Sequence, residues 1–131
     1  MTTPDAIILF AHGSRDPLWR APMEAVAQRI RTDHSQLQVQ CAYLELCSPD
    51  LPTVATEIVA ACAHSVSFNS QKHLKIRIIP MFLGMGKHAR EDLPELVRQL
   101  RSDHPDVTFE VSAAVGEDPR VIALLASMAV Q

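Results

Sequence analysis

Three side chains in this sequence have types and surroundings that suit chemistry: His12, Glu45 and His88. His12 lies in the string AHGSRD, Glu45 in YLELCS, and His88 in the glycine-containing string PMFLGMGKHARED. Imidazole and carboxylate groups bind borderline divalent transition metals such as cobalt, iron, nickel and zinc. Histidine also exchanges protons near neutral pH. These residue types therefore indicate metal binding, proton transfer or both, and they leave the reaction itself open.

Each of the three residues also has a plainer structural interpretation. A single histidine is usually a surface residue or a satisfied core residue, and either description would fit His12 or His88 alone. Glu45 stands between Leu44 and Leu46, where a carboxylate needs a partner. A structural salt bridge would supply one. The three residues have a common function only if the fold brings them to one place.

The elements that must position these residues follow from the hydrophobic pattern. Four apolar, β-branched runs alternate with four segments whose apolar residues recur at i, i+3, i+4 and i+7, the spacing of one helix face. The expected strands are Ala6–Ala11, about Leu37–Leu44, Leu74–Met81 and Val107–Val111. This order predicts an α/β fold, a single three-layer domain over residues 1–131 with a four-stranded parallel sheet flanked by helices on both faces. Because ligands bind beyond the carboxyl ends of parallel strands, His12, Glu45 and His88 should converge at one sheet edge.

Capping residues mark the expected starts of the helices. A capping side chain precedes a proline, the preferred order at a helix start, at Asp16-Pro17, Ser48-Pro49 and Asp118-Pro119. Asp92 and Glu95 have the spacing of a capping box, with Asp92 as the cap. The polar segment Ser65–His73 has no periodicity and is expected to be a surface loop. The last helical face consists of Val121, Leu124, Leu125 and Met128.

Composition argues against several classes of protein. With 131 residues, of which 47% are hydrophobic and 21% charged, the chain fits one soluble globular domain. No apolar run approaches the ~20 residues that a membrane span needs, and the N-terminus lacks the basic start of a signal peptide. We therefore expect a cytoplasmic protein with no membrane partner. The net charge of −3 argues against a nucleic-acid partner.

The cysteines and glycines narrow the possible cofactors. Cys41, Cys47 and Cys62 are odd in number and have no C-x-x-C spacing, so neither a disulfide framework nor a structural zinc site is expected. They are expected to be small buried hydrophobes. The glycine patterns of dinucleotide and P-loop sites are missing, and no organic cofactor is expected.

The strings around the three candidate residues resemble one known family, the sirohydrochlorin chelatases. LFAHGSRD, with His12, is similar to the opening of that family, and IPMFLGMGKHAREDLP, with His88, is similar to a later string. The intervening AYLEL is similar to the stretch that carries a substrate-contacting glutamate, here Glu45. The three matches come in the family's order and cover essentially the whole chain. One departure is Lys87, where the family commonly has glycine.

The resemblance implies a class II chelatase, a lyase that inserts a divalent metal into the tetrapyrrole sirohydrochlorin without ATP. In that family the histidine matching His12 is the proton acceptor and a metal ligand, and the one matching His88 is a second metal ligand. Both, with Glu45, are expected to be catalytic, and Leu83–Lys87 is expected to lie along the macrocycle. The expected substrate contacts are Ser14, Arg15, Glu45, Leu83, Gly84, Met85, Gly86 and Lys87, with further cations at Arg90 and Arg120.

The resemblance also suggests a metal and an assembly. The short forms most similar to this chain are cobaltochelatases of cobalamin biosynthesis, so Co²⁺ is the expected substrate metal. Fe²⁺, for siroheme synthesis, and Ni²⁺ are alternatives, because imidazole and carboxylate ligands do not separate these metals. Longer members contain two such domains across a cleft, so this chain is expected to form the cleft as a homodimer. A non-catalytic metal or tetrapyrrole carrier would use the same ligands and is the alternative function.

Overall fold

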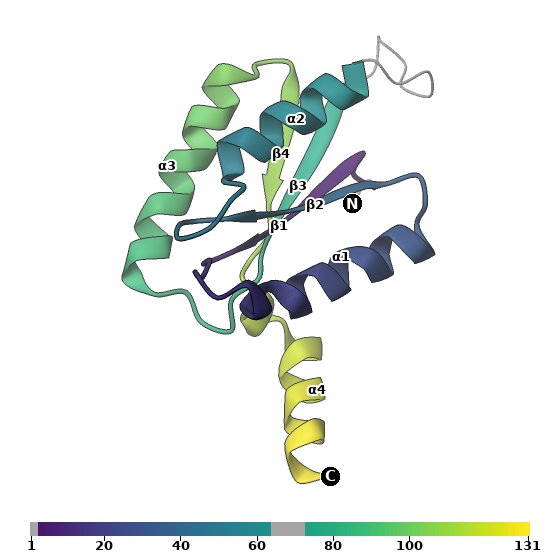
Figure 1. The fold of residues 1–131 in the computed structure, drawn as a ribbon, viewed down its shortest axis with the longest axis vertical. Coiled ribbons are helices and arrows are strands. Elements are labelled where there is room, and N and C mark those ends of the chain that lie inside the picture. Colours follow the sequence, from purple (N-terminus) through teal and green to yellow (C-terminus); the bar gives the residue numbers. More distant parts are fainter. Residues whose placement is uncertain (1–2, 64–72) are drawn as a thin grey trace.

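The computed structural model describes residues 3–63 and 73–131 and confirms the predicted α/β fold (Figure 1). One sheet of four parallel strands has the order β2-β1-β3-β4. The strands are β1 (Ala6–Ala11), β2 (Gln38–Tyr43), β3 (Leu74–Pro80) and β4 (Val107–Val111). The helices are α1 (Ala21–Asp33), α2 (Leu51–Ala63), α3 (Lys87–Asp103) and α4 (Pro119–Val130), with short 3-10 helices η1 (Pro17–Arg20) and η2 (Val115–Glu117). The predicted loop at Ser65–His73 lies outside the described residues except for its last residue.

The register of the sheet fixes where the chain leaves each strand. Ala6 at the start of β1 pairs with Gln38 on one side and Ile76 on the other. At the far end of β1, Ala11 pairs with Tyr43. The parallel strands are therefore aligned at their carboxyl ends, and the loops that follow β1, β2 and β3 all leave the same edge of the sheet.

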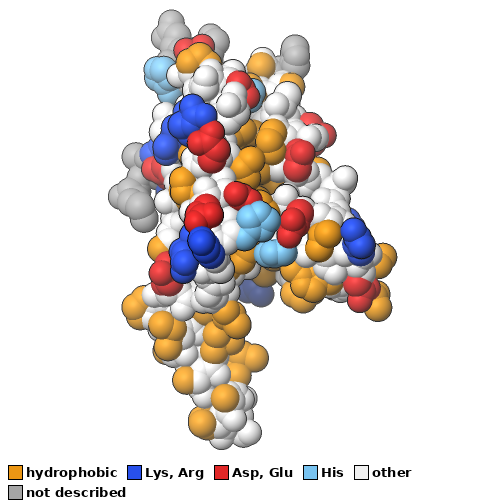
Figure 2. Space-filling view, turned by 90° about the vertical axis from the view of Figure 1, so that its left-hand side faces the viewer, with side chains coloured by type: hydrophobic (Ala, Val, Ile, Leu, Met, Phe, Trp, Pro, Cys, Tyr) orange, Lys and Arg blue, Asp and Glu red, His pale blue; other side chains and the backbone are white. Residues whose placement is uncertain are grey.

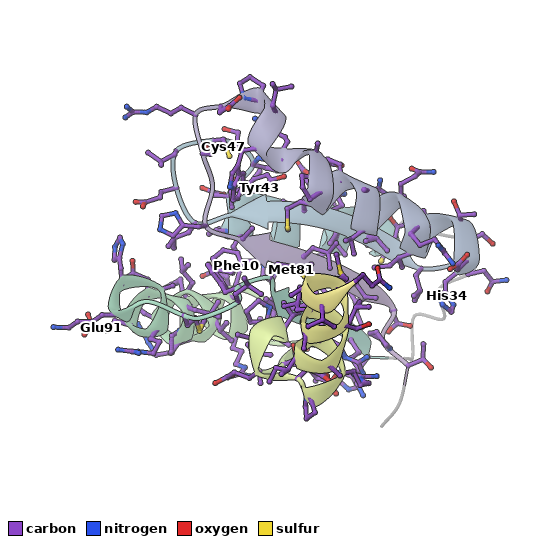
Figure 3. The ribbon with its side chains drawn as sticks, turned by 90° about the horizontal axis from the view of Figure 1, so that it is seen from below. Phe10, His34, Tyr43, Cys47, Met81 and Glu91 are labelled. Carbon is purple, nitrogen blue, oxygen red and sulfur yellow. The ribbon has the colours of Figure 1, made fainter. Side chains whose placement is uncertain are left out.

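The alternation of side chains along the strands divides the core into two layers. Phe10 and Ile78 are fully buried on the face that α2 and α3 cover. Leu9, Cys41 and Tyr43 belong to the core on the opposite face, together with residues of α1. Figure 3 shows Phe10 and Tyr43 on these opposite sides of the sheet. Helices therefore lie on both faces of the sheet, as predicted.

Two of the three cysteines are buried hydrophobes, in agreement with the sequence. Cys41 and Cys62 are buried in the two cores, whereas Cys47 is only half-buried, and all three are free thiols. Burial is the main cause that raises the pKa of the Cys41 thiol to about 11, with a smaller contribution from the neighbouring Glu24 carboxylate. Cys41 is therefore a protonated thiol at neutral pH and not a nucleophile.

Two of the predicted capping residues are confirmed. The Asp16 carboxylate accepts a hydrogen bond from the backbone N–H of Leu18 at 2.9 Å and starts η1, which leads into α1. The Asp118 carboxylate accepts one from the N–H of Arg120 at 2.8 Å and starts α4. In both places the following proline occupies the first turn, where no helical hydrogen bond is lost.

The predicted start of α2 at Ser48-Pro49 is wrong. The helix begins at Leu51, and the capping side chain is Asp50, whose Oδ1 accepts a hydrogen bond from the Thr53 N–H at 2.9 Å. Hydrogen bonds from Thr53 also lower the pKa of the Asp50 carboxyl. A carboxylate two residues further along the chain thus takes the role that the sequence pattern assigned to the serine.

The predicted start of α3 at Asp92 is also wrong. The helix begins at Lys87, and Pro94 lies inside it. Ala89 and Leu93 are both buried, and their i, i+4 spacing continues the apolar face of α3 one turn before the expected cap. The free energy gained by burying this extra turn exceeds the cost of the one backbone hydrogen bond that is lost because Pro94 has no N–H. Lys87 therefore lies in the helix and not in a loop.

The last helix does not cover the sheet. α4 extends away from the rest of the molecule (Figure 1), and none of its residues is buried. Leu124, Leu125 and Met128 of its predicted packing face are 61%, 42% and 60% exposed. The predicted helices on both faces of the sheet are thus supplied by α1 on one face and by α2 and α3 on the other. Among the described residues, no helix has the length and hydropathy to cross a membrane.

Candidate functional site

The loops after β1 and β2 are joined by backbone hydrogen bonds beyond the ends of the strands. The Leu44 N–H donates to the carbonyl of Ala11 at 2.9 Å, and the Glu45 N–H donates to the carbonyl of His12 at 3.1 Å. The loop after β3 starts from the same edge, because the Met81 N–H donates to a carbonyl of β1 at 2.7 Å. These bonds hold the segments that carry His12 and Glu45 side by side.

His12 and Glu45 form the first histidine–carboxylate pair. His12 Nε2 lies 3.6 Å from Glu45 Oε1, and the two side chains are 47% and 40% exposed. Because β2 ends at Tyr43, Glu45 is a half-exposed loop residue and not the strand-end acid expected from its leucine neighbours. Its partner is the histidine, so the salt-bridge interpretation and the functional interpretation describe the same contact.

Gly13 makes the close approach of these two loops possible. Its φ of 103° lies in the left-handed region, and a Cβ at this position would lie 1.8 Å from the carbonyl oxygen of Glu45. Only glycine fits here without a shift of the backbone. The loop then turns with Ser14, whose Oγ accepts a hydrogen bond from the Asp16 N–H at 3.1 Å. Gly13 is a residue of the site that the sequence analysis did not assign, although glycine directly after a strand-end histidine is a usable signal.

His88 and Asp92 form a second histidine–carboxylate pair. Both lie on α3 at i, i+4 spacing, and His88 Nε2 lies 2.8 Å from Asp92 Oδ2. The side chains are 62% and 42% exposed. The capping-box spacing predicts that Asp92 caps the helix and does not predict its contact with His88. Because α3 begins earlier, at Lys87, Asp92 lies inside the helix. The signal was the i, i+4 spacing of a histidine and a carboxylate.

The segment between β3 and α3 is an exposed loop on an apolar base. Phe82 and Met85 pack against the core, and the Phe82 ring meets that of Phe10 edge-on, with 6.1 Å between centroids. Leu83 between them is 69% exposed. A Cβ added at Gly84 would meet no atom within 4 Å. The same is true of Gly86, so the chain's own packing leaves open space beside this backbone.

The predicted cations fall into two groups. Arg15 and Lys87 are exposed on the loops of this edge or at the start of α3. Arg90 also lies on α3, where its Nη1 donates to the carbonyl of Met85 at 3.4 Å. Arg120 is elsewhere, at the start of α4, paired with Asp118 at 2.7 Å. This side-chain hydrogen bond is the main cause that lowers the pKa of the Asp118 carboxyl to about 2.

Neither pair is a complete metal site by itself. In residues 3–63 and 73–131, no group of three or more histidine, cysteine, aspartate or glutamate side chains is placed to hold a metal ion. On the face seen in Figure 2, histidine side chains adjoin acidic ones near the middle of the molecule. Each pair can accept protons and can offer imidazole and carboxylate ligands to a divalent ion.

An α/β domain with histidine–carboxylate pairs at the carboxyl edge of a parallel sheet has the layout of a metal-handling protein that acts on a bound ligand. A comparison with known families gives that class a name. The CbiX family model matches residues 6–131. The chain belongs to the CbiX family.

Relatives and solved structures agree with this membership. A sirohydrochlorin cobaltochelatase from Methanopyrus kandleri is 30% identical over 92 residues, which is 70% of this chain and 57% of the relative. The sirohydrochlorin cobaltochelatase of Methanosarcina acetivorans is 26% identical over 132 residues, covering 95% of this chain and 94% of the relative. A putative cobalamin biosynthesis CbiX protein from Marinobacter aquaeolei superimposes with a TM-score of 0.75 at 27% identity, over 96% of this chain and 94% of that one.

Proposed function

We propose that this protein is a sirohydrochlorin chelatase that inserts Co²⁺ into sirohydrochlorin in cobalamin biosynthesis, without ATP. The observation that carries the proposal is the pair of exposed histidines, each beside a carboxylate: His12 in the loop after β1, and His88 at the start of α3, which follows the adjacent strand β3. Family membership and the activity of the relatives named above support it. The match spans only 57% of the length of the Methanopyrus kandleri relative, so the activity is a proposal for this chain.

In this proposal the carboxylates determine which imidazole nitrogen acts. Asp92 lies against Nε2 of His88, and a proton shared in that contact leaves Nδ1 with a free lone pair for the metal. Glu45 lies 3.6 Å from Nε2 of His12, so its negative charge acts on that imidazole across a longer distance. Carboxylate–histidine contacts of this kind fix the tautomer and raise the basicity of a metal ligand.

Metal insertion requires that protons leave the macrocycle as the metal enters. As the metal passes from His12 to the pyrrole nitrogens, the imidazole nitrogen that it vacates accepts a pyrrole proton, and the nearby Glu45 carboxylate stabilises the imidazolium that forms. This proton passes to water, and the second pyrrole N–H proton then leaves by the same route. His88 acts as the second metal ligand. Because each ligand set is incomplete, the metal is held weakly enough to be transferred to the pyrrole nitrogens.

The substrate is anionic, and the chain has a net charge of −3, so local cations must bind it. We propose that Arg15 and Lys87 contact the peripheral carboxylates, since both are exposed at this edge and charged hydrogen bonds to carboxylates are strong. The exposed Leu83 and the open space beside Gly84 and Gly86 suit a flat macrocycle. Ser14 and Met85 complete the proposed contacts.

We further propose that the active form is a homodimer in which two such edges face one cleft. A second copy would place two more histidine–carboxylate pairs near the substrate, which is where the missing ligands can come from. Free thiols at Cys41, Cys47 and Cys62 suit a reducing compartment, so we place the reaction in the cytoplasm.

The test is anaerobic absorbance spectroscopy of metal-free sirohydrochlorin with catalytic amounts of the protein, run in parallel with Co²⁺ and Fe²⁺. We expect a multiple-turnover spectral shift well above the protein-free rate, faster with Co²⁺. His12→Ala should abolish it, whereas His34→Ala, an exposed histidine at the end of α1, should not. Tight binding without turnover would establish the carrier function instead, and a faster rate with Fe²⁺ would favour the ferrochelatase.

A further inference from the structure

The composition of α4 does not suit a helix in water. After Arg120 at its start, the helix has no charged residue as far as its end at Val130, and Ser127 is its one polar side chain after that arginine. A helix that is apolar all round is normally buried. Yet every residue from 122 to 130 is exposed, and hydrophobic side chains cover the projecting part at the bottom of Figure 2.

A groove of about 840 Å³ lies at the base of this helix. Ile79 from β3 lies in its wall and belongs to the core on the α1 face of the sheet. On that face α1 packs against β2 and β1, so the groove is on the half of the face formed by β3 and β4. The residues that line it include Arg77, Ile79, Glu110, Ser112, Ala113 and Val115.

We propose that the α4 helix of a second copy of this chain fills the groove, and that two copies exchange their α4 helices reciprocally. The position is the one that a helix following β4 would occupy in a doubly wound sheet. The dimensions agree, because a helix of 12 residues is ~18 Å long and the seven residues of β3 span ~23 Å.

The charges in the groove are compatible with an uncharged helix. Glu110 pairs with Lys75 at 3.2 Å and with Arg77 at 3.1 Å, across β3 and β4. Hydrogen bonds from Arg77 and then Lys75 lower the pKa of the Glu110 carboxyl, so this carboxylate stays ionised at neutral pH between its two basic partners. Because α4 carries no charge beyond Arg120, which pairs with Asp118, docking it adds no charge to the groove.

The helix of the same chain does not fill the groove in this structure. Asp118, Pro119 and Val121 at the start of α4 already form part of the groove wall, and the helix leads away from there (Figure 1). A second copy related by a two-fold axis presents its own α4 to the first groove while receiving the first α4 in return. Both apolar helices are then buried and both grooves are filled, so the assembly is closed at two copies.

This inference specifies the contact of the homodimer proposed above, and it is tested without the chelatase reaction. Mass is measured by light scattering during gel filtration at tens of micromolar. The unaltered chain should have twice the monomer mass of 14.5 kDa. Leu125→Glu with Met128→Glu, on the bulky face of α4, should halve the mass. The matched control, Ala123→Glu with Ala126→Glu, puts the same charges on the opposite face and should leave a dimer.

The groove side is tested by Ala113→Trp, which places a bulky ring in the space meant for the helix and should also give a monomer. Thr56→Trp, at an exposed position of α2, should remain a dimer. Circular dichroism and thermal unfolding show whether each variant is folded.

The decisive measurement mixes the two monomeric variants. The Ala113→Trp chain has an intact α4 and the Leu125→Glu/Met128→Glu chain has an intact groove, so together they can form one of the two exchanged contacts and should give a mixed dimer. A monomeric unaltered chain, whether or not it floats with vesicles of phosphatidylcholine and phosphatidylglycerol, would overturn the proposal. So would a dimer that survives Ala113→Trp, since the helices would then pair with each other outside the groove.

Discussion

At the scale of single residues, the site consists of two histidines that each have a carboxylate neighbour. The two contacts differ, because His88 and Asp92 lie 2.8 Å apart on one helix, whereas His12 and Glu45 lie 3.6 Å apart on two loops. The helical pair is fixed by a single element. The loop pair depends on how the two loops approach each other, so it is the one that a bound substrate can adjust.

Asp92 is expected to position His88. Asp92→Asn keeps a similar shape but removes the charge that holds the imidazole, and it should lower metal affinity or turnover by about 10- to 100-fold. Glu91→Gln, at an exposed position on the same helix, is the matched control. Calorimetric titration of the protein with Co²⁺ and measurement of KM for the metal separate positioning from folding. If Asp92→Asn and Glu91→Gln had the same affinity for Co²⁺ and the same KM for the metal, Asp92 would not position His88.

Gly13 is expected to be essential for the geometry of the His12–Glu45 pair. Gly13→Ala forces a Cβ to within 1.8 Å of the Glu45 carbonyl at a φ of 103°. Left-handed strain alone costs about 1–3 kcal/mol, so the free energy of unfolding should fall by at least that amount. Gly84→Ala, where a Cβ meets nothing within 4 Å, should unfold like the unaltered chain. Denaturant unfolding of both variants checks the difference, and equal midpoints would contradict it.

At the scale of elements, the sequence predicts the strands more accurately than the starts of helices α2 and α3. The bounds of β1 agree with the prediction because it lies between β2 and β3 and both of its faces are covered. The start of α3 was predicted wrongly because two local signals competed. Asp92 has the spacing of a cap, but burial of Ala89 extends the helix before it. A capping pattern cannot report tertiary burial.

The contact between Asp118 and Arg120 is expected to stabilise the start of α4 in a pH-dependent way. The side-chain and then the backbone hydrogen bonds from Arg120 lower the pKa of the Asp118 carboxyl from 3.8 to about 2. Because the folded pKa is depressed, the stabilisation is complete above about pH 4 and is lost as the pH falls through about 2. Carboxyl-carbon NMR should show a midpoint near 2 for Asp118, which Arg120→Gln moves upward. A midpoint near 3.8 in the unaltered chain would contradict this contact.

At the scale of the whole molecule, the net charge of −3 makes substrate binding depend on a few exposed cations. Removing a charged hydrogen bond costs about 1.5 kcal/mol, which is about tenfold in affinity. Arg15→Gln and Lys87→Gln should therefore each raise KM for sirohydrochlorin about tenfold and weaken its dependence on salt. Arg29→Gln, on α1 and paired with Asp33, is the control. An unchanged KM in the first two variants would place the carboxylate contacts elsewhere.

Contacts within the chain could be predicted from the sequence, whereas contacts with another molecule could not. Parallel strands imply that the segments of His12 and Glu45 meet, and the hydrogen bonds between their loops show that they do. The periodicity of α4 predicts an apolar face, and the structure leaves that face exposed, so the pattern does not say what the face packs against. The sequence of one chain carries the periodicity of a contact and not the identity of the partner.

Gly116, in η2 just before α4, contacts the loop that follows β3. Its N–H donates to the carbonyl of Phe82 at 2.9 Å, and a Cβ there would lie 1.8 Å from the carbonyl oxygen of Leu83. The base of α4 and the proposed substrate loop are thus in backbone contact, which gives a route for coupling between them. If dimer formation raises the affinity for the macrocycle by some factor, binding of the macrocycle must raise the affinity of dimerisation by the same factor. Under the proposed function, sirohydrochlorin would then promote dimer formation, and dilution alone would lower the activity.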